Sequence, residues 1–208
     1  MTKKPPFHIA LFVDGFTLKK VNEYYRFHHP FHSRLDFRGI KNWARQEALR
    51  LFAPDRNFAL MECHYYHPYK DPKRYGGNTA GISCFERELR YVGFQVHYAE
   101  SSSEYTQSPN MGLMQDALLF ATYRKINAVI LFSSQGQFAP LPDKLRALGI
   151  PTLLLGWNFT YPKDSRWIHW KTDCSLRDNS AYYIAMDKVA GSNPPAKDAS
   201  VKIFSLAS

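Results

Sequence analysis

The sequence predicts one three-layer α/β domain whose central sheet is mostly parallel, contains about five strands and is covered by helices on both faces. Two observations carry this prediction. Short apolar runs alternate with longer helical patterns from one end of the chain to the other, which is typical of βαβ units. Apolar residues make up 45% of the 208 residues, which is enough for a packed core. Two small domains are the alternative that this length leaves open.

The expected strands are short runs rich in branched apolar and aromatic residues, as strands buried in a parallel sheet are. They cover residues 8–13, 58–66, 94–98, 127–132 and 151–156. The expected helices show apolar residues at helical spacing and cover residues 16–27, 37–52, 79–91, 112–125, 138–148 and 176–189. Asp36 is a suitable N-cap for the second helix, and Gly93 is a suitable helix stop.

The remaining segments contain loop-forming residues. Residues 157–173 are aromatic, and we expect them to be irregular. Residues 191–199, GSNPPAKDA, have the composition of a linker, and residues 201–206 form either an added edge strand or a frayed tail. We therefore divide the chain into an N-terminal tail (1–7), one domain (8–189) and a linker with a C-terminal tail (190–208).

The chain is strongly basic. It carries 27 Lys and Arg against 18 Asp and Glu, a formal net charge of +9. Such a surface favours a polyanionic partner, nucleic acid first and an anionic membrane second, although a generally cationic soluble protein would have the same charge. Aromatic residues make up 15%, which would allow base stacking but also suits a core.

The cysteines and the absence of hydrophobic targeting segments indicate a cytoplasmic protein. Cys63, Cys84 and Cys174 have no metal-binding or paired spacing, which favours free thiols in a reducing compartment. The first residues, MTKKPP, do not resemble a signal peptide, and no apolar run approaches the ~20 residues that span a bilayer. There is also no G-x-x-x-x-G-K-[ST] or G-x-G-x-x-G motif, which argues against nucleotide-binding folds.

Polar residues gather where three predicted strands end or helices begin. Asp14 follows the first strand, the segment 110–116 opens a helix, and Ser-Ser-Gln-Gly-Gln-Phe (133–138) follows the strand 127–132. The carboxyl ends of parallel strands hold ligands in open α/β sheets, so we expect these segments to meet at one edge.

At these segments the sequence resembles the NYN domain family, in its LabA-like branch, among the PIN-like ribonucleases. Four stretches carry the resemblance over about residues 8 to 189: IALFVDGFTL, RLDFRGIKNWA, FERELRYVGFQVHY and NAVILFSSQGQFAPLPDKLRALGIPTLLLG. The first resembles an opening strand that runs into D-G-x-N-L, and the last resembles S-G-D-S-D-F followed by a helix. The resemblance implies Mg²⁺- or Mn²⁺-dependent RNA cleavage by converging carboxylates.

The acidic positions that the resemblance implies are largely changed in this chain. Asp14 and Asp116 match family aspartates, and Ser133 matches the family serine. Thr17 stands where the family has Asn. The three remaining acidic positions carry amides, namely Asn110, Gln135 and Gln137. A neutral amide offers a metal one oxygen and no charge, so we expect no cofactor, or only weakly bound Mg²⁺ or Mn²⁺ at Asp14.

Three functions stay open at this point. The first is a pseudo-nuclease that binds RNA, because amide N–H groups suit phosphates, ribose hydroxyls and base edges. The second is an active Mg²⁺- or Mn²⁺-dependent endoribonuclease using Asp14 and Asp116, completed by Glu62, Glu100 or Glu104. The third is a protein-interaction scaffold or a homodimer. We expect RNA and not a membrane as the partner, and enzyme activity is left uncertain.

The candidate RNA-binding residues are basic or aromatic side chains near the predicted ligand edge or in the basic-aromatic stretch after the fifth strand. They are Lys19, Lys20, Lys70, Lys73, Arg74, Tyr75, Lys163, Arg166, Trp167 and Lys171. Aromatic rings among basic residues suit single strands, whose bases are free to stack.

Overall fold

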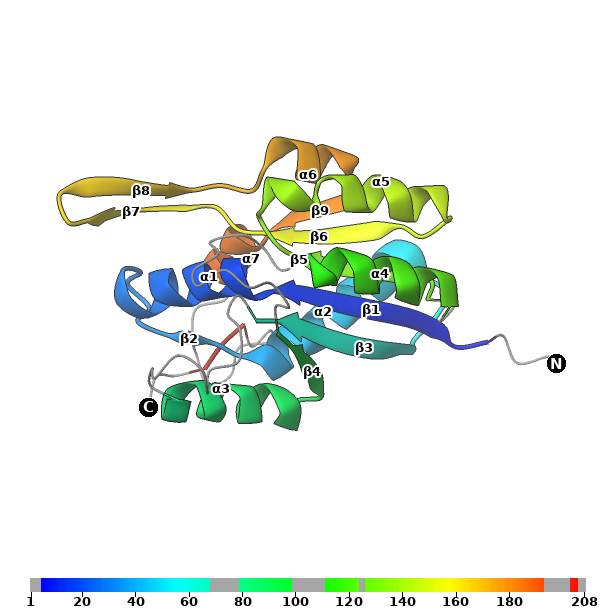
Figure 1. The fold of residues 1–208 in the computed structure, drawn as a ribbon, viewed down its shortest axis with the longest axis horizontal. Coiled ribbons are helices and arrows are strands. Elements are labelled where there is room, and N and C mark those ends of the chain that lie inside the picture. The colour runs from blue at the N-terminus through cyan, green and yellow to red at the C-terminus, as the bar shows by residue number, and fades with distance from the viewer. Residues whose placement is uncertain (1–4, 68–78, 99–110, 124–125, 193–202, 206–208) are drawn as a thin grey trace.

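A parallel sheet forms the middle layer of the protein, as predicted. The computed structural model describes residues 5–67, 79–98, 111–123, 126–192 and 203–205. Within these ranges six strands pair in the order β4-β3-β1-β5-β6-β9, and all five pairings are parallel (Figure 1). The strands are β1 (Phe7–Asp14), β3 (Ala59–Tyr66), β4 (Phe94–His97), β5 (Ala128–Phe132), β6 (Thr152–Gly156) and β9 (Tyr182–Ala185).

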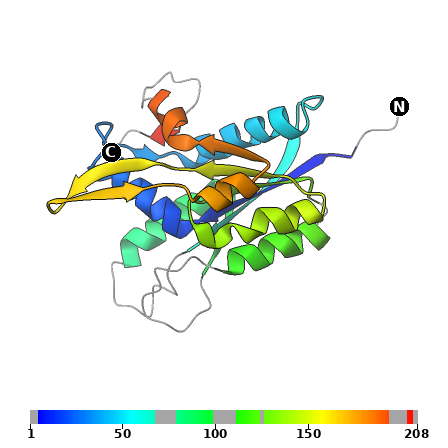
Figure 2. The same cartoon turned by 90° about the horizontal axis from the view of Figure 1, so that it is seen from above.

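Helices cover both faces of this sheet. They are α1 (Gly15–Phe27), α2 (Phe37–Phe52), α3 (Thr79–Tyr91), α4 (Gly112–Tyr123), α5 (Pro140–Ala147), α6 (Cys174–Asn179) and α7 (Met186–Ser192). Side chains of α1, α2, α3 and α7 contribute to one core cluster, and those of α4, α5 and α6 contribute to the other. Figure 2 shows α2 and α7 on one side of the sheet and α4 and α5 on the other. The expected three-layer α/β class is therefore confirmed.

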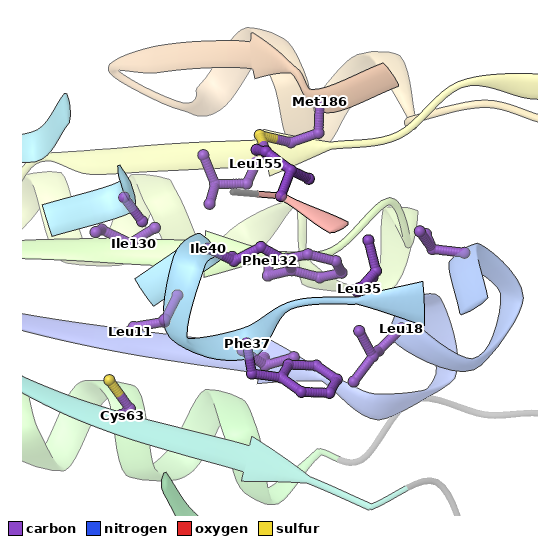
Figure 3. Close-up of a cluster of buried hydrophobic side chains, with 14 of the residues drawn as sticks. Leu11, Leu18, Leu35, Phe37, Ile40, Cys63, Ile130, Phe132, Leu155 and Met186 are labelled. Carbon is purple, nitrogen blue, oxygen red and sulfur yellow. The ribbon is translucent and has the colours of Figure 1, made fainter. Parts of the chain in front are cut away.

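The central strands supply both cores because successive residues of a strand face opposite sides. In β1, Leu11 faces one core and Phe12 the other; in β5, Phe132 and Leu131 do the same. This is why both strands read as unbroken apolar runs. Figure 3 shows Leu11 and Phe132 in the first core together with Ile40 of α2.

The expected helix ends are confirmed. The Asp36 side chain accepts a hydrogen bond from the Gly39 N–H at 2.9 Å and caps α2. Gly93 has φ +89° after α3, in the left-handed region that glycine enters without steric cost.

Residues 157–173 were expected to be irregular, and this prediction is wrong. Here β7 (Phe159–Lys163) and β8 (Arg166–Trp170) form an antiparallel hairpin. Its two-residue turn, Asp164 and Ser165, has φ +47° and +61°, the positive pair that a tight hairpin requires. The usual Asn-Gly or Asp-Gly signal is absent, and the strand contains Pro162, a residue that strands disfavour.

The prediction of a single helix over residues 176–189 is also wrong. The chain forms the short helix α6, then β9, then α7. Tyr182, Tyr183 and Ile184 pair with β6, whose outer edge would otherwise be open, so tertiary pairing overrides the helical pattern. This strand is the sixth of a sheet expected to have about five.

The C-terminal segment supplies an edge strand, one of the two alternatives for residues 201–206. β10 (Phe204–Ser205) pairs antiparallel with β2 (Arg34–Leu35). Ile203 and Phe204 are buried in the core beside α1 and α2. The boundaries drawn between tail, domain and linker stay a prediction. Among the helices of the described residues, none is long and apolar enough to cross a membrane.

Truncating a core residue of the central strands should destabilise the protein far more than truncating an exposed leucine. Leu131 of β5 is fully buried, whereas Leu119 of α4 is 52% exposed. We expect Leu131→Ala to lower the free energy of unfolding by about 2–5 kcal/mol and Leu119→Ala by less than about 0.5 kcal/mol. Urea unfolding followed by circular dichroism measures both, and equal losses would contradict this core.

Candidate functional site

Asp14 ends β1 and caps α1 at the carboxyl edge of the sheet. Its side chain is 1% exposed. One carboxylate oxygen accepts the Phe16 N–H at 3.0 Å. The other accepts the Thr17 N–H at 3.2 Å, the Thr17 hydroxyl at 2.6 Å and the Ser133 hydroxyl at 3.1 Å. Burial raises the pKa of Asp14, and these hydrogen bonds oppose the rise.

The end of β5 is joined to Asp14 through hydroxyl groups. The Ser134 N–H donates to the Thr17 hydroxyl at 3.1 Å, so Thr17 connects α1 to β5. The Ser134 hydroxyl lies 3.2 Å from that of Thr172 and accepts the Trp157 N–H at 3.1 Å. The structure therefore brings three predicted residues, Asp14, Thr17 and Ser133, into one buried network. Ser134 and Thr172 were not predicted.

The glutamines lie at the rim of this network. Gln135 is half-buried and Gln137 is exposed, on either side of Gly136 in the short helix Gly136–Phe138. The Gln135 N–H donates to the Ser133 hydroxyl at 3.1 Å. Asn110, the third predicted amide, lies outside the described residues.

Asp173 is a carboxylate at this edge that the sequence analysis missed. Its N–H donates to the Ser134 carbonyl at 3.1 Å. A side chain at Gly136 would place its Cβ 2.8 Å from the Asp173 carboxyl carbon, so the two residues are in close contact. The same carboxylate accepts the Leu176 N–H at 3.1 Å and caps α6. The Asp-Cys-Ser-Leu sequence is an N-cap pattern that could have indicated it.

Asp116 lies in a second polar cluster, at the carboxyl ends of β3 and β4. Its carboxylate accepts the Tyr66 hydroxyl at 2.7 Å and lies 3.8 Å from His97 Nδ1. The ring of His97 stacks on that of Tyr66, and its Nε2 lies 3.1 Å from His64 Nδ1. Tyr66 is the register partner of Asp14 on the adjacent strand. Among their described hydrogen-bond partners, Asp14 and Asp116 share none.

Of the acids proposed to complete a metal site, the structure describes only Glu62. One of its carboxylate oxygens lies 2.9 Å from His8 Nε2, and the other lies 3.8 Å from Nε2 of His64, a member of the Asp116 cluster. Glu100 and Glu104 lie outside the described residues. Across those residues, no three His, Cys, Asp or Glu side chains come together in a group that could hold a metal ion.

The β7–β8 hairpin lies alongside α1 and continues into this site. Phe159 stacks on Tyr24 of α1 at 4.3 Å between ring centroids, and Trp170 lies 6.0 Å from Phe16. Figure 1 shows the hairpin extending beyond the sheet. After β8, Thr172 and Asp173 make the contacts with Ser134 described above.

The predicted RNA-binding residues of the hairpin and α1 are mostly exposed. Trp167 is 65% exposed, and Arg166 and Lys171 are exposed beside it. Lys163 is also exposed but forms an ion pair, because its ammonium lies 2.6 Å from the Glu23 carboxylate. Glu23 also lies 3.9 Å from the ammonium of Lys20. Among the remaining candidates, Lys19 of α1 is exposed. The others lie outside the described residues, namely Lys70, Lys73, Arg74 and Tyr75.

Removing the Asp14 carboxylate should cost more stability than removing an ordinary helix cap. Asp14→Ala leaves four donors without their acceptor, so we expect a loss of about 3 kcal/mol in the free energy of unfolding. Asp36→Ala is the matched control, because Asp36 caps α2 through a hydrogen bond from Gly39, and it should cost about 1 kcal/mol. Equal losses in urea unfolding would contradict the role given to the Asp14 network.

Acid should destabilise the fold through His67. Burial lowers the pKa of His67 from 6.5 to about 4. The unfolded chain therefore binds this proton first, and stability falls as the pH drops from about 6.5 to about 4, by up to about 3 kcal/mol. Burial lowers the pKa of His97 too, in the same direction.

Urea unfolding between pH 7 and pH 4 measures this dependence. His67→Gln should flatten the slope, whereas His169→Gln, at an exposed position on the hairpin, should leave it unchanged. An unchanged slope in His67→Gln would show that other groups cause the acid sensitivity.

Comparisons with known proteins agree with this architecture. A crystal structure of a protein of unknown function from Vibrio parahaemolyticus is similar to this chain with a TM-score of 0.64 and 21% sequence identity, covering 90% of this chain and 97% of that one. At this identity the likeness shows the fold alone. Among curated proteins, none is similar enough in sequence to count as a relative. Residues 8–187 match the family described as NYN domain, and the chain therefore belongs to the NYN domain family, with a PIN-like nuclease fold.

Proposed function

We propose that this chain binds RNA without cutting it, as a pseudo-nuclease of the NYN family. The observation that carries the proposal is the state of Asp14, the acid at the centre of the edge where the family's metal chemistry is expected. Its carboxylate is enclosed by four hydrogen bonds and is 1% exposed.

A carboxylate in this state does not fit a catalytic Mg²⁺ or Mn²⁺ ion. Three of the four hydrogen bonds converge on one carboxylate oxygen, which leaves that oxygen no free lone pair, and the other oxygen accepts the Phe16 N–H. Mg²⁺ keeps several waters and binds through one or two accessible carboxylates in near-octahedral geometry. Asp14 is 1% exposed, so a hydrated ion could reach the remaining lone pair only if the surrounding residues moved.

The residues around Asp14 support the same conclusion. Gln135 and Gln137 carry no charge, so they neither recruit a divalent cation nor repel a phosphate. Asp173 is half-buried and engaged as the cap of α6. The nearby amide groups can donate to phosphate oxygens and ribose hydroxyls, which are the groups that RNA presents along its backbone.

Charge supports RNA as the partner. The chain carries a net charge of +9. Exposed Lys171 and Arg166 lie on the segment that leads from the site to the hairpin tip, and Lys19 is exposed on α1. Basic side chains along a path from a strand-end site suit a phosphate backbone. We propose that Lys70, Lys73, Arg74 and Tyr75 join this surface.

An active endoribonuclease using Asp14 and Asp116 has less support. Asp116 is held by Tyr66 and lies beside His97, in a polar cluster separate from the Asp14 network. No specific observation favours a protein-interaction scaffold or a homodimer. We also propose placement in the LabA-like branch and a cytoplasmic location, which the three cysteines support because none of them forms a disulfide.

An assay with one labelled single-stranded RNA tests the proposal. The protein should retard the RNA in a native gel equally with Mn²⁺, Mg²⁺ or EDTA, and the RNA should stay intact in a denaturing gel. Binding should weaken steeply with salt, because phosphate contacts release counterions.

The controls are Asp14→Ala and Asp116→Ala. Cleavage that requires metal and disappears in Asp116→Ala, a variant at a half-exposed position, would refute the pseudo-nuclease. Cleavage that persists equally in both variants would indicate a contaminating nuclease. A protein that neither shifts nor cuts RNA would refute RNA binding.

A further inference from the structure

The β7–β8 hairpin has one packed face and one open face. The packed face, which is turned toward α1, carries Phe159, Tyr161 and Trp170. Phe159 and Tyr161 are buried, and all three side chains contact other aromatic rings. Phe159 and Trp170 are register partners, and their rings are nearly parallel, 6.1 Å apart. The hairpin is therefore anchored along α1.

The open face carries an aromatic ring in a fixed place. Cross-strand partners point to the same side of a sheet. Thr160 pairs with His169 and Pro162 pairs with Trp167, and all four are exposed. The Thr160 hydroxyl lies 3.3 Å from His169 Nδ1. Trp167 is 65% exposed and lies opposite Pro162 on a hairpin whose other face packs on α1. Its indole is therefore presented to solvent, and it should lose little conformational entropy when a ligand binds.

A basic residue follows this face at the end of β8. Lys171 is exposed directly after the strand, and Asp164 is the acid at the turn. Arg166 pairs with Lys163, so these two belong to the same face as Phe159 and Trp170, and Lys163 is paired there with Glu23. Beyond Lys171 the chain reaches Asp173, whose N–H binds the Ser134 carbonyl at the site edge.

We propose that the open face of this hairpin is a platform for single-stranded RNA, with one unpaired base stacked on Trp167 and the phosphates running past Lys171 toward the site edge. This inference rests on the proposed RNA binding and gives it a substrate class. A duplex keeps its base faces stacked inside, whereas an unpaired base can present a face to an exposed ring.

Fluorescence anisotropy of a labelled 12-nucleotide single strand, compared with a 12-base-pair duplex, tests this platform. Trp167→Ala should raise the Kd for the single strand about 5- to 100-fold, the range for losing one base–aromatic stack. Trp167→Phe keeps a ring and should stay within about threefold of the wild type. Tyr123→Ala is the matched control, because Tyr123 is a 78% exposed ring at the far end of α4, and its Kd should not change.

Two further readouts separate stacking from charge. The salt dependence of binding should be the same in Trp167→Ala and the wild type, while Lys171→Ala should reduce the salt slope by about one and Arg166→Ala, on the other face, should leave it unchanged. Single-stranded RNA should change the tryptophan fluorescence of the wild type and leave that of Trp167→Phe largely unchanged. Circular dichroism and thermal melting verify that each variant is folded.

The outcomes distinguish this inference from the function on which it rests. Single-strand binding that is equal in Trp167→Ala and the wild type would overturn the platform and leave RNA binding in place. Equal or tighter binding of the duplex would overturn the single-strand preference. No binding of either RNA would overturn both. A blue shift of Trp167 on anionic vesicles, without any response to RNA, would assign the hairpin to a membrane surface instead.

Discussion

The carboxylate of Asp14 is the interaction on which this edge of the protein depends. It joins the end of β1, the first turn of α1 and the end of β5, segments more than 100 residues apart in the chain. Burying an ionised carboxylate costs several kcal/mol, and hydrogen bonds to a charged group return about 1.5–3 kcal/mol each. Four such bonds are enough to offset the cost. These hydrogen bonds favour the ionised form and oppose the rise in the pKa of Asp14 that burial causes.

Thr17 and Ser133 supply the side-chain hydroxyls that hold this carboxylate. The Thr17 hydroxyl donates to Asp14 and accepts from the Ser134 N–H, so it closes the space between α1 and β5. A threonine hydroxyl supplies this bridge with a side chain short enough to stay within the first turn of the helix.

The sequence was sufficient to predict the layers, because the central strands β1, β5 and β6 are buried on both faces and contain clear apolar runs. It also located Asp14, Thr17 and Ser133 at one edge, since strand ends meet there in any parallel sheet. The wrong predictions concern segments whose secondary structure is determined by tertiary contacts. The Asp164–Ser165 turn lacks glycine, and Tyr182–Ala185 forms a strand because β6 offers it an edge. Asp173 was missed because the unpredicted hairpin brings it back to Ser134.

The hairpin contacts the Asp14 site through both of its ends, and these contacts connect the proposed RNA-binding surface to the site. Rings on the inner face of the hairpin pack on α1, whose first turn is capped by Asp14. At the other end, Thr172 and Asp173 contact Ser134 beside the same carboxylate. The RNA strand proposed for the hairpin would therefore lie on a surface connected at both ends to the Asp14 network. In the proposed pseudo-nuclease, the carboxylate that the family resemblance assigns to metal binding would instead hold this surface in place.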